Sequence, residues 1–159
     1  MFMTLIREYD DADAQQLEEC FVELQDNERR IDAYLADSRS VSKSYLEYMF
    51  GRCAETAGKV FVAEVDGRVA GFVSVWAKVK AKVVEEREYE YAYVSDLVVL
   101  AKYRGRGLGR SLLLKAEGYA AGQGARLLRI GVLARNEVAR GLYRSCGFED
   151  RVVEMSKEL

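Results

Sequence analysis

Residues 103–111 read Tyr-Arg-Gly-Arg-Gly-Leu-Gly-Arg-Ser and separate a long apolar stretch from an amphipathic one. Glycines at such a junction let the backbone approach a ligand closely, and the N-terminus of the helix expected to follow offers free N–H groups. Arginines at three positions add positive charge. The segment therefore predicts a site for a phosphate or pyrophosphate, formed by Arg104, Gly105, Arg106, Gly107, Leu108, Gly109 and Arg110.

Two common nucleotide motifs do not fit this glycine-rich segment. A P-loop ending at Gly109 would need glycine at position 104 and lysine at position 110, and both positions hold arginine. A dinucleotide fingerprint starting at Gly105 would need a third glycine at position 110. The pattern that fits is arginine or glutamine, two residues, glycine, one residue, then glycine or alanine, filled by Arg104, Gly107 and Gly109. Taken by itself, the segment also allows a plain glycine-rich turn with solvated arginines.

Composition limits the chemistry that the chain can perform. Its 159 residues correspond to one domain, residues 1–159, in which half the residues are hydrophobic and the net charge is −2. This balance lacks the basic surface that nucleic-acid binding requires. Histidine is absent, which excludes Ser-His-Asp catalysis and His-ligated zinc. Cys20, Cys53 and Cys146 are odd in number and widely spaced, so we expect packing residues and neither a metal site nor a disulfide framework.

The sequence gives no reason to expect a membrane protein. The longest apolar runs span only a few residues, such as 97–101, and these are too short to cross a bilayer. The stretch MFMTLIREYDD lacks the basic start and apolar middle of a signal peptide. We therefore expect a cytoplasmic protein.

Apolar periodicity and turn signals predict one α/β (α+β) domain with the element order α-α-β-β-β-α-β-α-β. In chain order the expected elements are a helix opening at Asp13, a helix over 44–58, a β-hairpin turning at Asp66-Gly67, a strand over 91–100, a helix over 107–124, a strand over 127–133, a helix after Asn136 and a last strand over 152–157.

Two segments of this pattern carry more specific information. Residues 93–99 read Tyr-Val-Ser-Asp-Leu-Val-Val, and four residues later 104–109 read Arg-Gly-Arg-Gly-Leu-Gly. Downstream stand Asn136, Ala139, Leu142-Tyr143 and Gly147-Phe148. At this spacing, over about 91–148, the chain resembles the GNAT superfamily of N-acetyltransferases. It departs from many members at Ala101, where they have proline.

The resemblance implies a mixed, mostly antiparallel central sheet flanked by helices, whose fourth strand bulges and splays from the fifth. Exposed backbone groups of Leu97, Val98 and Val99 would then bind the pantetheine arm of acetyl-CoA, and the amides of 104–109 would hold its pyrophosphate. Asn136 would first cap its helix and could also contact CoA or water.

The resemblance also implies catalytic roles. Tyr143 matches the family tyrosine that points at the CoA sulfur, and its phenol can donate a proton to a departing thiolate; core packing is the alternative. Asp96 is expected to be the general base or a contact for the acceptor, with Ser95 at most positioning water or substrate. Glu88 and Glu90 either face the acceptor cleft or form a solvated edge.

The expected function is transfer of an acetyl group from acetyl-CoA to a primary amine, by direct attack in a ternary complex and without a metal. The acceptor would be a small cationic amine or a peptide amine, and a homodimer is compatible with the resemblance. The alternatives are a non-catalytic acyl-CoA-binding or regulatory domain and, weakened by the two failed motifs, a nucleotide-binding module.

Overall fold

The computed structural model describes residues 3–159, which form a five-stranded mixed sheet with helices on both faces. The strands lie in the order β1 (Thr4–Glu8), β2 (Lys59–Val65), β3 (Arg68–Lys80), β4 (Glu90–Val99) and β5 (Leu128–Ile130). The helices are α1 (Ala14–Arg29), α2 (Ser38–Glu55), α3 (Leu108–Gly122) and α4 (Glu137–Ser145), with short 3-10 turns η1 (Asp11–Asp13) and η2 (Ala101–Tyr103). Neighbouring strands are antiparallel except β4 and β5, which are parallel. The expected mixed, mostly antiparallel sheet is confirmed.

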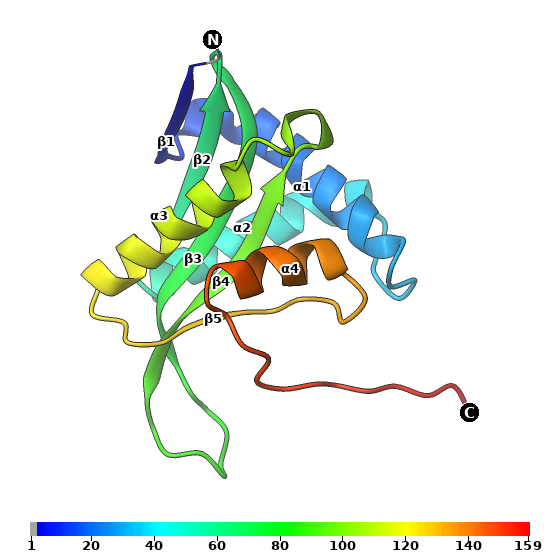
Figure 1. Cartoon of the computed structure of the whole chain (residues 1–159), viewed down its shortest axis with the longest axis vertical. Helices are drawn as coiled ribbons and strands as arrows, with labels where there is room; N and C mark the ends of the chain where they lie inside the picture. The colour runs from blue at the N-terminus through cyan, green and yellow to red at the C-terminus, as the bar shows by residue number, and fades with distance from the viewer. Residues whose placement is uncertain (1–2) are drawn as a thin grey trace.

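The sheet separates two apolar cores (Figure 1). Helices α1 and α2 cover one face, where Leu17, Phe21 and Met49 pack against the central strands. Helices α3 and α4 cover the other face, where Leu112 and Tyr143 lie in the second core. Each sheet face is thus closed by one pair of helices, so a site that reaches both cores must pass through the sheet itself.

β4 contains one extra residue relative to its neighbour β3. Ser74 of β3 pairs with Asp96 whereas the next residue pairs with Val94, which leaves Ser95 as a β-bulge. One inserted residue reverses the alternation of side chains between the two faces. Val94 accordingly packs in the core under α3, whereas Val98 packs in the core under α1 and α2. The bulge therefore turns Asp96 toward α2.

The fourth and fifth strands separate just after this point, as the resemblance implied. β5 pairs with β4 only from Ala92 to Val94. Beyond Val94, the described part of the chain offers no strand partner on that side of residues 95–99. The sheet therefore splits beside the bulge.

Both ends of the predicted element order need correction. Thr4–Glu8 forms an edge strand that the sequence analysis missed, because its alternation is short and only Ile6 packs against a core. The last strand expected over 152–157 is wrong, since residues 148–159 form no regular secondary structure. Its apolar side chains, such as Val153, are exposed and have no strand to pair with in the described residues.

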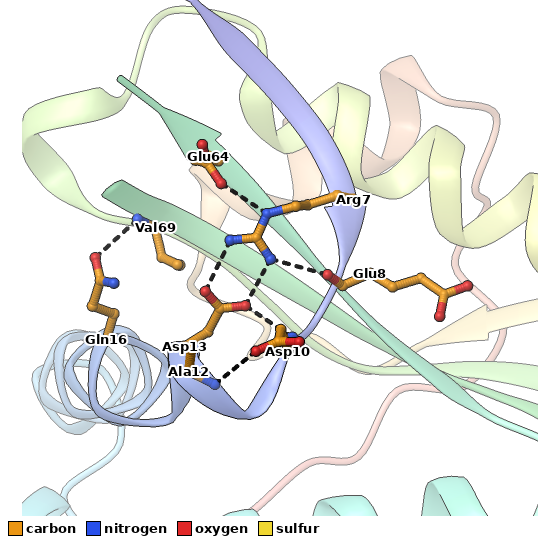
Figure 2. A network of polar contacts seen from close by, with 8 residues as sticks. All are labelled: Arg7, Glu8, Asp10, Ala12, Asp13, Gln16, Glu64 and Val69. Carbon is orange, nitrogen blue, oxygen red and sulfur yellow. Dashed lines mark hydrogen bonds and ion pairs between the residues drawn. The ribbon is translucent and has the colours of Figure 1, made fainter. Parts of the chain in front are cut away.

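The edge strand β1 is fastened by the Arg7 guanidinium (Figure 2). Arg7 donates to Glu64 of β2 at 2.7 Å and to both carboxylate oxygens of Asp13 at 2.7 and 2.9 Å. Asp13 also accepts from the Asp10 amide and so closes a capping box with Asp10. The 3-10 turn η1 thus begins just after Asp10, ahead of the helix expected to open at Asp13, and Gln16 accepts from the Val69 amide at 3.0 Å.

Two local sequence signals are confirmed. Asp66 and Gly67 adopt positive φ angles of 48° and 77° and join β2 to β3 in the predicted hairpin. Asn136 caps α4 by accepting from the Ala139 amide at 3.2 Å, and Gly147, at φ 90°, ends that helix. Within residues 3–159, none of the helices combines the length and the apolar content needed to cross a bilayer.

Candidate active site

A cavity of about 220 Å³ lies where β4 and β5 separate. Its wall is formed by Phe21, Leu24, Gln25 and Glu28 of α1, Leu35, Tyr45 of α2, Val94, Ser95, Asp96 and Leu97 of β4, Ile130, Gly131 and Tyr143 of α4. The volume is below the roughly 300–1,000 Å³ of sites that enclose a drug-sized ligand. The cavity therefore suits one end of a ligand, in a wall that combines apolar side chains with hydroxyl, amide and carboxylate groups.

Asp96 is the most deeply buried carboxylate in this wall, with 7% of its surface exposed. Its Oδ1 accepts from the Tyr45 hydroxyl at 2.8 Å and its Oδ2 accepts from the Ser95 hydroxyl at 2.7 Å. Burial raises the pKa of Asp96, and the two hydroxyls oppose that shift. Asp96 is thus held rigidly by two neutral donors in an environment that disfavours its charge.

Tyr143 reaches the same cavity from the opposite face of the sheet. The Asn136 cap and the Gly147 ending fix the register of α4, and Phe148 donates its amide to the Tyr143 carbonyl. Burial, together with the negative charges of Glu28 and Asp96, raises the pKa of Tyr143 to about 12. Its phenol therefore stays protonated at neutral pH and can donate a proton. Core packing and a place in the cavity wall are both observed for this residue.

The glycine-rich segment forms an open cradle at the start of α3. Gly105 and Gly107 have φ angles of 75° and 78°, which L side chains rarely adopt. A Cβ atom at either position would meet no described atom within 4 Å, so space for a ligand lies beside the backbone. No side chain of residues 3–159 caps this 15-residue helix at Gly107. Free N–H groups and the helix dipole therefore favour an anion at this end.

The arginine side chains of the segment serve the scaffold. Arg104 donates to the Val99 carbonyl at 2.8 Å, and Arg110 donates to the Ser145 carbonyl at the end of α4 at 3.1 Å. Arg106 lies over the Tyr103 ring at 5.6 Å. Each of these arginines thus has a contact with the protein itself, and the anion site at the start of α3 stays a prediction.

Leu97, Val98 and Val99 form the part of β4 that follows the bulge, and their contact with the pantetheine arm stays a prediction. They follow the bulge on β4, and Leu97 lines the cavity. Leu97 and Val99 pack toward α3, whereas Val98 is buried on the other face. Their side chains are thus in the cores while one edge of their backbone lacks a strand partner in the described sheet.

None of the acidic residues over 85–90 lines this cavity. Residues 85–89 belong to the loop between β3 and β4, which extends away from the body of the molecule in Figure 1, and Glu90 begins β4 opposite Lys80. Glu88 and Glu90 are exposed, and neither lines the cavity. Glu88 and Glu90 therefore lie outside the wall of this cavity, and both interpretations, a place at the acceptor cleft and a solvated edge, stay predictions.

The carboxylate that the sequence analysis missed is Glu28. It lies in the last turn of α1 and lines the cavity together with Asp96. The apolar stripe of α1 already included Phe21 and Leu24, and Glu28 follows Leu24 by four residues on the same helix face. Its place on that face was a usable signal, but the contact with β4 arises only through folding.

Comparisons with known proteins agree with this geometry. Residues 21–148 match the Acetyltransferase (GNAT) family, which covers most of the chain, so the chain belongs to that family. An uncharacterized N-acetyltransferase of Methanocaldococcus jannaschii is 30% identical over 125 residues, covering 79% of this chain and 53% of that protein. The chain thus spans about half the length of this relative.

Two solved structures share the fold. A tetramutant of the BH1408 protein of Bacillus halodurans superposes with a TM-score of 0.77 at 19% identity, over 98% of this chain and 99% of the other. An aminoglycoside N-acetyltransferase, AAC(6')-Iy, in complex with CoA superposes with a TM-score of 0.68 at 16% identity, over 100% of this chain and 97% of the other. At these identities the likeness concerns the fold alone.

Proposed function

We propose that residues 1–159 form one acetyl-CoA-dependent N-acetyltransferase domain that acetylates a primary amine. The observation that carries the proposal is a single cavity at the split of β4 and β5, in which a buried phenol from one face and carboxylates from the other meet. Family membership supports acetyl transfer. The amine class of the acceptor rests on the carboxylates.

The chain offers a fitting surface for acetyl-CoA. The uncapped start of α3 and the open glycines Gly105 and Gly107 suit a pyrophosphate, and the edge of 97–99 suits the amides of the pantetheine arm. Asn136 is committed to its cap, so contact with CoA would be its second role. Bound there, acetyl-CoA supplies an activated acetyl group as a thioester.

Residues on the two sides of the cavity then have different roles, one in binding the amine and the other in protonating the leaving group. Asp96, buried and held by Tyr45 and Ser95, offers negative charge to the ammonium of an entering amine. Tyr143 offers its phenolic proton to the thiolate that leaves. Because both groups face one small cavity, the amine and the thioester can meet there in a ternary complex.

A thiol-release assay tests this function. The protein is incubated with acetyl-CoA and, in turn, spermidine, kanamycin, lysine and a short basic peptide, and free CoA thiol is measured. We expect amine-dependent release with at least one acceptor. Tight binding of acetyl-CoA without release for any amine would instead favour a non-catalytic acyl-CoA-binding domain.

The variant Tyr143→Phe tests the mechanism, because it keeps the ring and removes the proton donor. We expect kcat to fall by roughly 10²–10⁴-fold with little change in the Kd for CoA. Calorimetric titration with CoA and single-turnover rates separate binding from chemistry. Equal single-turnover rates in both proteins would return Tyr143 to a packing role.

A further inference from the structure

One face of α1 ends in an acidic residue, Glu28, that lines the cavity. Phe21, Leu24, Gln25 and Glu28 follow the i, i+3, i+4, i+7 spacing and all four line the cavity wall. The apolar members form the part of the wall next to the helix, and Glu28 stands at its end. Glu28 of α1 and Tyr143 of α4 therefore line the same cavity from two different helices.

Glu28 occupies an unfavourable position for a negative charge. It lies in the last turn of α1, where the helix dipole repels anions. Its side chain is partly buried, and within residues 3–159 no hydrogen bond or ion pair reaches its carboxylate. Burial and the charge of Asp96 raise its pKa. A bound cation would offset the repulsion of the Glu28 carboxylate by the helix dipole and by Asp96.

The neighbouring groups distinguish Glu28 from Asp96. The titratable groups that face Glu28 are Asp96 of β4, Tyr45 of α2 and Tyr143 of α4. The guanidinium of Arg135, in the loop before α4, is bound to the Ile31 carbonyl. Both oxygens of Asp96 accept hydrogen bonds from hydroxyl groups, whereas no such hydrogen bond within residues 3–159 occupies the Glu28 carboxylate.

We propose that Glu28 is the proton acceptor of the reaction and that Asp96 binds the acceptor's ammonium. This inference rests on the proposed transferase function. Glu28 takes one proton from the ammonium, directly or through one water, and becomes a carboxylic acid. The freed nitrogen lone pair forms a bond to the acetyl carbonyl carbon, the carbon–sulfur bond breaks, and Tyr143 protonates the leaving thiolate. The excess proton on the new amide nitrogen passes to solvent. Glu28 then releases its proton to solvent, and the Tyr143 phenolate takes one proton back from solvent.

The variant Glu28→Gln tests the assignment with the most active amine among spermidine, kanamycin, lysine and the basic peptide. We expect kcat at neutral pH to fall by roughly 10²-fold or more. The deficit should shrink as the pH approaches the pKa of the acceptor amine, because an amine that is already neutral needs no base. Glu19→Gln, at an exposed position of the same helix, is the matched control and should leave kcat unchanged.

The stability of Glu28→Gln gives a second, independent result. Because the substitution removes a charge that its surroundings disfavour, we expect its unfolding midpoint in urea to equal or exceed that of the parent. A deficit in kcat that is the same at every pH, or that comes with a loss of stability, would assign Glu28 a structural role and overturn the proposal. Unchanged kcat in a parent that releases thiol would overturn the Glu28 assignment alone. Absence of thiol release by the parent with every amine would overturn the transferase function and this inference together.

Discussion

The described residues 3–159 include two buried aspartates whose surroundings are opposite in kind. Asp13, 5% exposed, receives two hydrogen bonds from the Arg7 guanidinium, as Figure 2 shows, and this contact lowers its pKa. Asp96, 7% exposed, receives two hydrogen bonds from the hydroxyls of Tyr45 and Ser95, and burial raises its pKa. No lysine or arginine of residues 3–159 is among the groups that shift Asp96.

The two aspartates differ in whether the protein itself supplies a cationic partner, and this property helps to separate structural carboxylates from candidates for ligand binding. The charge of Asp13 is neutralised by the protein itself, in the place where β1 joins the sheet. The charge of Asp96 lacks such a partner and lies in the wall of a cavity. Since an unpaired buried charge is costly, we propose that Asp96 is positioned to bind a cation.

The same substitution at both positions tests this comparison most strongly. In Asp96→Asn we expect kcat/KM for the best amine to fall on the order of 10²-fold, because a buried partner of the ammonium is lost. In Asp13→Asn we expect kcat/KM close to that of the parent, with the damage confined to stability. Steady-state thiol release at saturating acetyl-CoA measures both, and the Kd for CoA should be the same in all three proteins. Equal losses of kcat/KM in the two variants would break the comparison.

Much of the fold could be predicted from local signals, because those signals act locally. The Asp66-Gly67 turn, the Asn136 cap and the glycine-rich start of α3 each work within a few residues. The two errors at the ends of the chain have a different cause. β1 depends on the Arg7 contacts with a distant strand, and the exposed residues 152–157 have β-branched side chains but no strand partner in the described structure.

The site could be predicted only in part, because some of its contacts join segments that are distant in the sequence. The motif indicated Tyr143 and Asp96, but the partners of Asp96 come from a bulge and from α2, which no local pattern announces. The sequence analysis considered Glu88 and Glu90 for the acceptor cleft, whereas folding places Glu28 in the wall of the cavity and leaves Glu88 and Glu90 exposed outside it. Which carboxylates line the cavity depends on their position relative to the split in the sheet, and this position arises only when the chain folds.

The Arg7 side of the comparison predicts a loss of stability without a loss of function. Arg7→Met keeps most of the aliphatic bulk and leaves Asp13 buried without its cation, which we expect to lower the free energy of unfolding by about 1–3 kcal/mol. Urea unfolding measures the change. Lys59→Met is the matched control, because the ion pair of Lys59 with Glu8 is exposed and its removal should have a smaller effect. If the two variants lose the same stability, the Asp13 contact contributes no more than a surface pair.

The smallest expected effect is the sharpest test, because the two aspartates should respond to pH with opposite signs. The pKa of Asp13 is lowered in the folded state, so its contribution to stability is present above the ordinary aspartate pKa and is lost as the pH falls through the folded value. The pKa of Asp96 is raised, so the protonated form stabilises the fold, and that contribution is lost as the pH rises through the raised value. Relative to the parent, Asp13→Asn should therefore be least stable at neutral pH and recover on acidification. Asp96→Asn should gain relative stability as the pH rises from the acidic range to neutrality. Urea unfolding of the three proteins over that range gives both slopes. Two slopes of the same sign would mean that Asp96 is neutralised within the protein like Asp13, and the case for a cation-binding cavity at the split of β4 and β5 would fall.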